Sequence, residues 1–303
     1  ISLWMEALEP GKPLTFLDHH IQCGNSLLGC SPDLLSKGIP DAAFTPLSSD
    51  DRDYCNRFRR QNREERDLEV LDIFSADNRT WATTHSYAPK QIILDQMADS
   101  DLESLTQKEL TFAQIRESEE YQHPKFIYDA WCAAFVISKS PDNGLPYPIT
   151  QRVMDNLQAD PDNIDPALKA EITRLADTYR FFHWHLAFPE VFSPPVLIHS
   201  TTLPKQQPRQ AGFDCVLGNP PWERVKLQEK EFFAARDADI ANAPNAAARK
   251  RMIDALPTSN PLLYQTFLAE KRISEGSSLL IRESGRYPQI GRASCRERVY
   301  HPV

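Results

Sequence analysis

The sequence lacks any apolar run of the ~18 residues that a membrane-spanning helix needs, and it has no signal peptide. Its six cysteines are widely scattered. No two of them have the spacing of zinc ligands, and together they suggest no disulfide framework. We therefore expect a cytoplasmic protein that does not enter a membrane and holds no metal ion.

The chain also has few glycines and no excess of basic residues. It carries 10 Gly against 24 Pro, which predicts stiff, ordered connections rather than flexible linkers. Its formal net charge of −8 argues against a chain whose main task is to grip DNA phosphates. The charge leaves open an enzyme that acts on DNA while another region binds most of the duplex.

Helical periodicity dominates the middle and the end of the chain. Apolar residues recur there at spacings of three and four, which is typical of amphipathic helices. The expected helical stretches are 50–74, 89–120, 125–138, 166–188, 228–256 and 261–283. Residues 193–211, with prolines near both ends, are typical of a linker.

Two short runs are instead typical of strands. Leu14–Cys23 is closed by a glycine-containing turn, and Phe213–Leu217 is an apolar run of the kind that forms a buried parallel strand. The second run ends abruptly at Gly218. Ligands of open α/β sheets bind beyond the carboxyl ends of the strands, and Asn219 is expected at such an end.

The residue types in Asn219–Trp222 suit the methylation of an exocyclic amino group. Such a group on adenine or cytosine is a poor nucleophile, because its lone pair is delocalised into the ring. The side-chain oxygen of Asn219 and the carbonyl of Pro220, in a loop stiffened by Pro221, offer two acceptors for its N–H bonds. Trp222 is expected to stack on a base flipped from the duplex. The structural alternative is that the prolines end a strand and Trp222 packs into a core.

The run Phe213–Trp222 (FDCVLGNPPW) resembles the catalytic motif of adenine-N6 DNA methyltransferases. The likeness is greatest to the large bacterial enzymes of restriction–modification and phage-defence systems. Residues 223–233 and 16–29 resemble the same group. The resemblance implies a site-specific DNA methyltransferase with S-adenosyl-L-methionine as methyl donor, DNA with a flipped adenine as partner, and a linked or separate nuclease.

The fold implied by this resemblance is α/β: part of a seven-stranded, Rossmann-like methyltransferase sheet with a large, mostly helical insertion. The resemblance assigns Gly24, Asn25 and Gly218 to the methyl donor. The position of Asn25, beside the donor's adenine, is commonly an aspartate in the family. An asparagine still accepts a hydrogen bond there through its amide oxygen, but more weakly.

The expected organisation has four parts. Residues 1–30 and 193–292 belong to the methyltransferase core, 31–192 form the insertion, and 293–303 depart from the family pattern as a truncated or non-native tail. The glycine-rich donor loop and its acidic ribose partner belong upstream of Ile1, so we expect the natural protein to start earlier and this piece to be inactive alone.

Alternatives remain open at this point. Cytosine N4 or a protein glutamine can replace adenine as acceptor, and the chain can be a helical scaffold that retains a degenerate methyltransferase core. His183 and His185 suggest a metal, but without a third ligand nearby a packed aromatic segment is favoured. The basic clusters 57–60 and 249–251 are interpreted as solvated helix faces.

Overall fold

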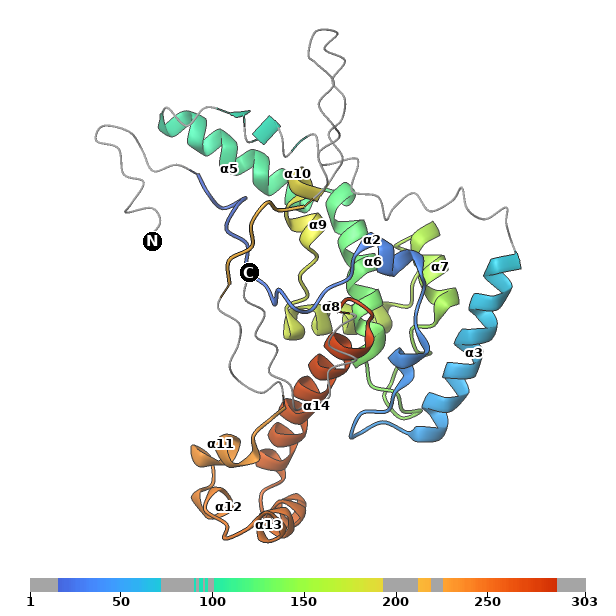
Figure 1. Cartoon of the computed structure of the whole chain (residues 1–303), viewed down its shortest axis with the longest axis vertical. Coiled ribbons are helices and arrows are strands. Elements are labelled where there is room, and N and C mark those ends of the chain that lie inside the picture. The colour runs from blue at the N-terminus through green and yellow to red at the C-terminus, as the bar shows by residue number, and fades with distance from the viewer. Residues whose placement is uncertain are drawn as a thin grey trace.

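A computed structural model describes residues 16–71, 101–192, 212–218 and 226–287, together with positions 90, 93, 94, 96 and 97. These residues are organised in helices and loops (Figure 1). The elements are α2 (Pro32–Ser36), the 3-10 helix η1 (Asp41–Phe44), α3 (Arg52–Leu71), α5 (Leu102–Glu117), α6 (Glu119–Val136), α7 (Gln151–Ala159), α8 (Pro166–Tyr179), α9 (Trp184–Ala187), α10 (Pro189–Phe192), α11 (Glu229–Ala234), α12 (Ala238–Ala241), α13 (Ala246–Ser259) and α14 (Pro261–Glu283).

Helix α6 is the centre of the main hydrophobic core. Its side chains are buried on all sides through most of its length, among them Tyr128, Trp131 and Phe135. Such an all-round apolar helix is stable only inside other elements. The helices α5, α7, α8 and α14 and the 3-10 helix η1 all pack against it.

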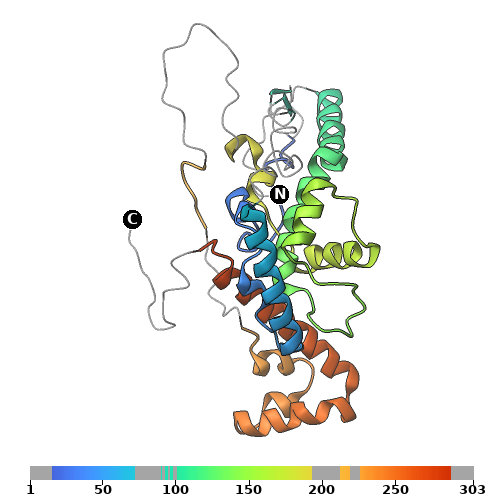
Figure 2. The ribbon, with the colours of Figure 1, turned by 90° about the vertical axis from the view of Figure 1, so that its right-hand side faces the viewer.

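A second, smaller core lies at one end of the molecule. It joins α11, α12 and α13 to the first half of α14, through residues such as Phe233, Ile253 and Phe267. The second half of α14 contributes Leu279 and Leu280 to the main core. Helix α14 therefore links the two cores, as both views of the ribbon show (Figures 1 and 2).

Capping residues set the limits of the long helices. Helix α14 starts with Pro261, and the side chain of Asn260 accepts a hydrogen bond from the amide of Leu263 at 3.1 Å. Helix α8 ends at Tyr179 because Arg180 adopts a left-handed conformation with φ of 52°. The helix expected over 166–188 is therefore too long, although the helix expected over 261–283 is confirmed.

The expected α/β sheet is wrong. In the described part of the chain the structure is helical, and its one β-type contact is an isolated parallel bridge between Asn25 and Phe181. Residues 213–217 form no strand there: the side chains of Val216 and Leu217 are 76% and 92% exposed. A buried parallel strand requires neighbouring strands at its edges and elements that cover both of its faces. Among the described residues, no strand pairs with 213–217.

The first strand-like run also differs from expectation. Residues 17–21 form a turn, in which the amides of His20 and Ile21 both donate to the carbonyl of Leu17 at 2.9 Å.

In the described regions, no helix is both long and apolar enough to cross a membrane. Five cysteines lie in those regions, and all five are free thiols.

Candidate functional site

Residues 24–30 contain Gly24 and Asn25, which are expected at the methyl donor, and we call them the donor turn. They are held by the segment that follows α8. The amide of Asn25 donates to the carbonyl of Arg180 at 2.8 Å, and the amide of Phe182 donates to the carbonyl of Leu28 at 2.7 Å. The Asn25 side chain lies at the surface, where its Oδ1 accepts from the amide of Leu27 at 3.2 Å. The turn is thus anchored by backbone hydrogen bonds, and the Asn25 amide group stays accessible.

Two glycines allow this close approach. A Cβ atom on Gly29 would lie 2.0 Å from the carbonyl oxygen of Phe182, and one on Gly24 would lie 2.4 Å from a ring carbon of Phe182. Both distances are far below contact distance, and the first is to backbone, which moves with difficulty. Glycine is therefore required at position 29 for a steric reason.

A buried polar chain connects the same turn to α6. The His183 ring accepts from the Cys30 amide through Nδ1 at 3.1 Å, so its other nitrogen, Nε2, carries the proton and donates to Asp129 Oδ1 at 2.9 Å. Lys125 donates to Asp129 Oδ2 at 2.6 Å. Asp129 and His183 are both nearly inaccessible to solvent. In this network of Lys125, Asp129, His183 and the Cys30 amide, each buried polar atom has a partner, which is the condition for a stable buried network.

Residues 212 and 213, which precede the expected catalytic loop, pack on residues 181–192, a segment rich in aromatic side chains. The amide of Gly212 donates to the carbonyl of Val191 at 3.1 Å. The Phe213 ring makes edge contacts with three aromatic rings at centroid distances of 5.5–5.8 Å, those of Trp184, Phe188 and Phe192. The indole of Trp184 also donates to the Ser26 carbonyl at 3.1 Å.

Residues 181–192 therefore contact two regions that are far apart in sequence. One is the donor turn at 24–30, and the other is the segment 212–218 that leads into the Asn-Pro-Pro-Trp motif. Asn219, Pro220, Pro221 and Trp222 themselves lie outside the described residues. Gly218, the last described residue before them, is exposed and has open space around it.

Burial keeps a histidine and two thiols beside the donor turn uncharged. Burial, with the nearby His183 and Arg286, lowers the pKa of His185 to about 3, so this ring is neutral at physiological pH. Burial likewise raises the pKa of the Cys30 and Cys132 thiols. The two histidines lie against the Tyr128 ring, at 4.4 Å from His185 and 5.5 Å from His183. This confirms the interpretation of 181–185 as a packed aromatic segment.

The Asn25 side chain is chemically compatible with the adenine end of the expected methyl donor. The amide of an asparagine matches the edge of adenine, since its oxygen accepts from the exocyclic amino group while its nitrogen donates to a ring nitrogen. Asn25 Oδ1 already holds one hydrogen bond, from Leu27, and a carbonyl oxygen has a second lone pair. Asn25 therefore has the accessibility and the remaining capacity to hold an adenine ring.

Comparison with known proteins bears on the expected motif. Residues 149–253, about a third of the chain, match the family model described as Eco57I restriction-modification methylase. The match supports a restriction–modification methylase family. It spans α7 to α12 and the first part of α13, includes Phe213–Trp222, and extends to both sides of the expected boundary at residue 192. The four-part division of the chain stays a prediction. No curated protein and no solved structure matched the chain.

Two residues that hold the donor turn were not predicted to do so from the sequence: Asp129, and His183 as its hydrogen-bonding partner. They lie 54 positions apart, so no local motif contains both. One signal was present: Asp129 is the one carboxylate in the apolar run 126–137, and a buried carboxylate requires a partner. The contact of Trp184 with Ser26 spans 158 positions and has no signal in the sequence.

Proposed function

We propose that the chain belongs to a DNA methyltransferase of a restriction–modification or phage-defence system, which methylates adenine at N6. The observation that carries the proposal is the family match over 149–253, because the matched region contains the motif Asn219–Trp222. Packing supports it independently. The segment entering the motif and the turn bearing Asn25 meet on the aromatic segment 181–192.

S-adenosyl-L-methionine, when bound, supplies the methyl group. Asn25, with Gly24 beside it, would hold the adenine end of this donor. Gly218, at the entrance to the loop that receives the target base, would also contact the donor. Asn219 Oδ1 and the Pro220 carbonyl accept the two N–H bonds of the target amino group. Pro221 stiffens the loop, and Trp222 stacks on the flipped base.

These acceptors explain the reactivity without a general base. With both amino hydrogens held by the Asn219 and Pro220 acceptors, the nitrogen lone pair would be available to bond the methyl carbon as the sulfur–methyl bond of the donor breaks and leaves a neutral thioether. The proton then lost from the nitrogen would pass to water. The loop thus contributes chiefly orientation and electrostatic stabilisation.

The test is product identification with the protein expressed from its complete reading frame. It is incubated with S-adenosyl-L-methionine labelled in the methyl group and with unmethylated DNA, and the DNA is digested to nucleosides. We expect the label in N6-methyladenine. Label in N4-methylcytosine would overturn the choice of base while keeping the loop chemistry, and label in protein glutamine would overturn the choice of DNA.

A helical scaffold without catalytic function is the rival of a different class. It is favoured by the helical character of the described residues, among which no sheet is formed. It predicts that the complete protein binds no S-adenosyl-L-methionine in equilibrium dialysis. Measurable donor binding at a single site contradicts it.

A further inference from the structure

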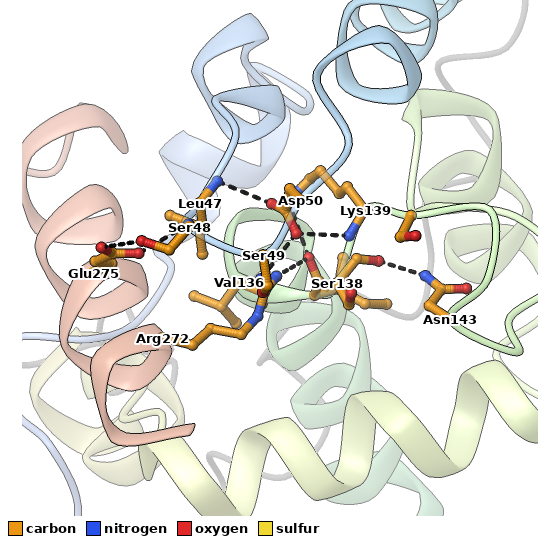
Figure 3. A network of polar contacts seen from close by, with 12 residues as sticks. Leu47, Ser48, Ser49, Asp50, Val136, Ser138, Lys139, Asn143, Arg272 and Glu275 are labelled. Atoms are coloured by element: carbon orange, nitrogen blue, oxygen red, sulfur yellow. Dashed lines mark hydrogen bonds and ion pairs between the residues drawn. The ribbon is translucent and has the colours of Figure 1, made fainter. Parts of the chain in front are cut away.

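A polar groove runs between the loop 45–50, the start of α3 and the second half of α14. Its volume is about 600 Å³. Charged side chains of both signs line it: Asp50, Arg52, Lys226, Lys271, Glu275 and Arg282. We call it the α14 groove. Figure 3 shows the polar network on one of its sides, with Arg272 and Glu275 of α14 pointing toward the loop 47–50.

The two carboxylates of the groove are already engaged by the protein. The side chain of Asp50 is fully buried and accepts from the amides of Leu47 and Lys139 at 3.0 Å and from Arg272 Nη1 at 2.8 Å. Glu275 accepts from the Ser48 amide at 3.0 Å and from the Ser48 hydroxyl. Their negative charge is therefore largely satisfied from within.

The cations of the groove are not engaged in the same way. Arg52, Lys226 and Arg282 are exposed, and no carboxylate among the described residues forms an ion pair with any of them. Lys271 lies at 4.0 Å from Glu275, at the outer limit of an ion pair. Four cationic side chains thus face two internally bonded carboxylates, although the chain as a whole has a net charge of −8.

The groove lies next to the motif along the chain. Lys226 follows Trp222 by four positions, and four residues span at most about 14 Å when fully extended. Duplex DNA carries one negative charge per ~1.7 Å of its axis, so about eight phosphates fall within such a length. The span between Trp222 and Lys226 is thus comparable to the distances over which DNA bound at Trp222 presents several phosphates.

We propose that the α14 groove binds the phosphodiester backbone of duplex DNA beside the base that is methylated, through Arg52, Lys226, Lys271 and Arg282. The proposal rests on the proposed function, since it takes the loop after Gly218 as the place of the target base. Arginine and lysine side chains at a surface are the groups that replace the counterions of DNA.

Salt dependence separates this groove from the effect of overall charge. A labelled 30-base-pair duplex is titrated with the complete protein at several NaCl concentrations, and fluorescence anisotropy gives the affinity. The groove variant combines Arg52→Ala, Lys226→Ala and Arg282→Ala. The control combines Lys37→Ala, Lys250→Ala and Arg251→Ala, which removes the same charge from exposed positions that do not line the groove.

Each lost phosphate contact lowers the slope of log affinity against log salt by about 0.9. We expect the groove variant to lose about 2 to 3 units of slope and at least tenfold in affinity at 0.1 M NaCl, while the control keeps the slope of wild type. Equal losses in both variants, or no binding by wild type, would overturn the proposal. Thermal melting by circular dichroism confirms that both variants are folded.

The same preparations are assayed for methyl transfer, so that the two proposals fail separately. If wild type methylates DNA but the groove variant binds DNA like the control, the proposed DNA binding by the α14 groove is wrong and the proposed methylation is kept. If the groove variant alone loses DNA binding while wild type transfers no methyl group to DNA, DNA binding by the groove is kept and the proposed methylation is wrong.

Discussion

Removing the carboxylate of Asp129 is expected to destabilise the protein and to loosen the donor turn. In Asp129→Ala, the Nε2–H of His183 keeps no acceptor among its present partners, in a site where the ring is 3% exposed. Asp129 also forms a charged pair with Lys125. Breaking a buried charged pair by removing one partner costs about 3–5 kcal/mol. Lys125 is 33% exposed and regains hydration, which places the expected loss near the lower end, at ~3 kcal/mol.

The assay is urea unfolding followed by far-UV circular dichroism, with Asp129→Ala compared to two other variants. Asp129→Asn keeps an acceptor for His183 and loses the charge, so about half of the loss is expected. Asp162→Ala removes a surface carboxylate paired with Lys169 at 2.9 Å, and little change is expected because water screens that pair.

Hydrogen exchange gives a local reading of the same change. The Cys30 amide donates to His183 Nδ1 at 3.1 Å, so a released ring should speed exchange at Cys30 before the protein unfolds globally. If Asp129→Ala loses less than ~1 kcal/mol and leaves the Cys30 amide protected, the chain from Asp129 through His183 does not hold the donor turn.

Three further predictions test separate features. Gly29→Ala places a Cβ 2.0 Å from the Phe182 carbonyl oxygen, so the free energy of unfolding in urea should fall by ~1–3 kcal/mol. As a control, the Cβ of Gly218→Ala meets nothing within 4 Å and should change stability little. Equal stability of the two variants would contradict the packing. Burial lowers the pKa of His185 to about 3; the unfolded chain takes up this proton near pH 6.5 and the folded chain does not, so stability falls as the pH drops from 6.5 toward 3. His185→Leu should flatten that fall in acid unfolding, and an unchanged curve would refute the assignment. Burial lowers the pKa of Lys139 to about 8; the unfolded chain holds this proton up to about pH 10.4, so the destabilisation is complete below pH 8 and fades above it. The stability of wild type should therefore rise relative to Lys139→Met between pH 8 and 10, and a constant difference would count against the buried ammonium.

The sequence allowed the long helices to be predicted where periodicity and caps agree. Asn260 and Pro261 mark the start of α14, and its apolar spacing continues to Glu283. Residues 228–256 were expected as one helix because periodicity was followed alone. Asp237 and Asn245 cap new helices there, by accepting from the amides of Ile240 and Ala248. Such side chains compete with the helical backbone, which periodicity does not register.

The sheet was predicted from an apolar run, and five apolar residues do not determine a strand. Phe213–Leu217 has the composition of a buried strand, but its structure depends on partners that the run does not contain. In the described residues Phe213 packs against aromatic rings while Leu217 faces solvent. The resemblance of the motif supported a chemistry, and the inference from chemistry to a surrounding sheet was wrong here.

The site was predictable only in parts. The positions 24–25 and 219–222 were proposed from local patterns, because turns and proline pairs are local features, and their roles stay a prediction. The hydrogen bonds that join the turn at 24–30 to Trp184 and His183 instead span more than 150 positions. Such contacts are set by how α6 and α8 pack, and the packing partners of a helix do not appear in its own sequence.

In the proposed mechanism, the Asn219 side chain prepares an adenine amino group for methylation. The most direct measurement is the yield of N6-methyladenine in unmethylated DNA, for wild type, Asn219→Ala and the control Asn242→Ala, which changes an exposed asparagine at the end of α12. We expect wild type and the control to form N6-methyladenine at equal initial rates. The rate of Asn219→Ala should be lower by at least about a hundredfold, as for loss of one transition-state hydrogen-bonding group. Equal rates in Asn219→Ala and the control would contradict the claim.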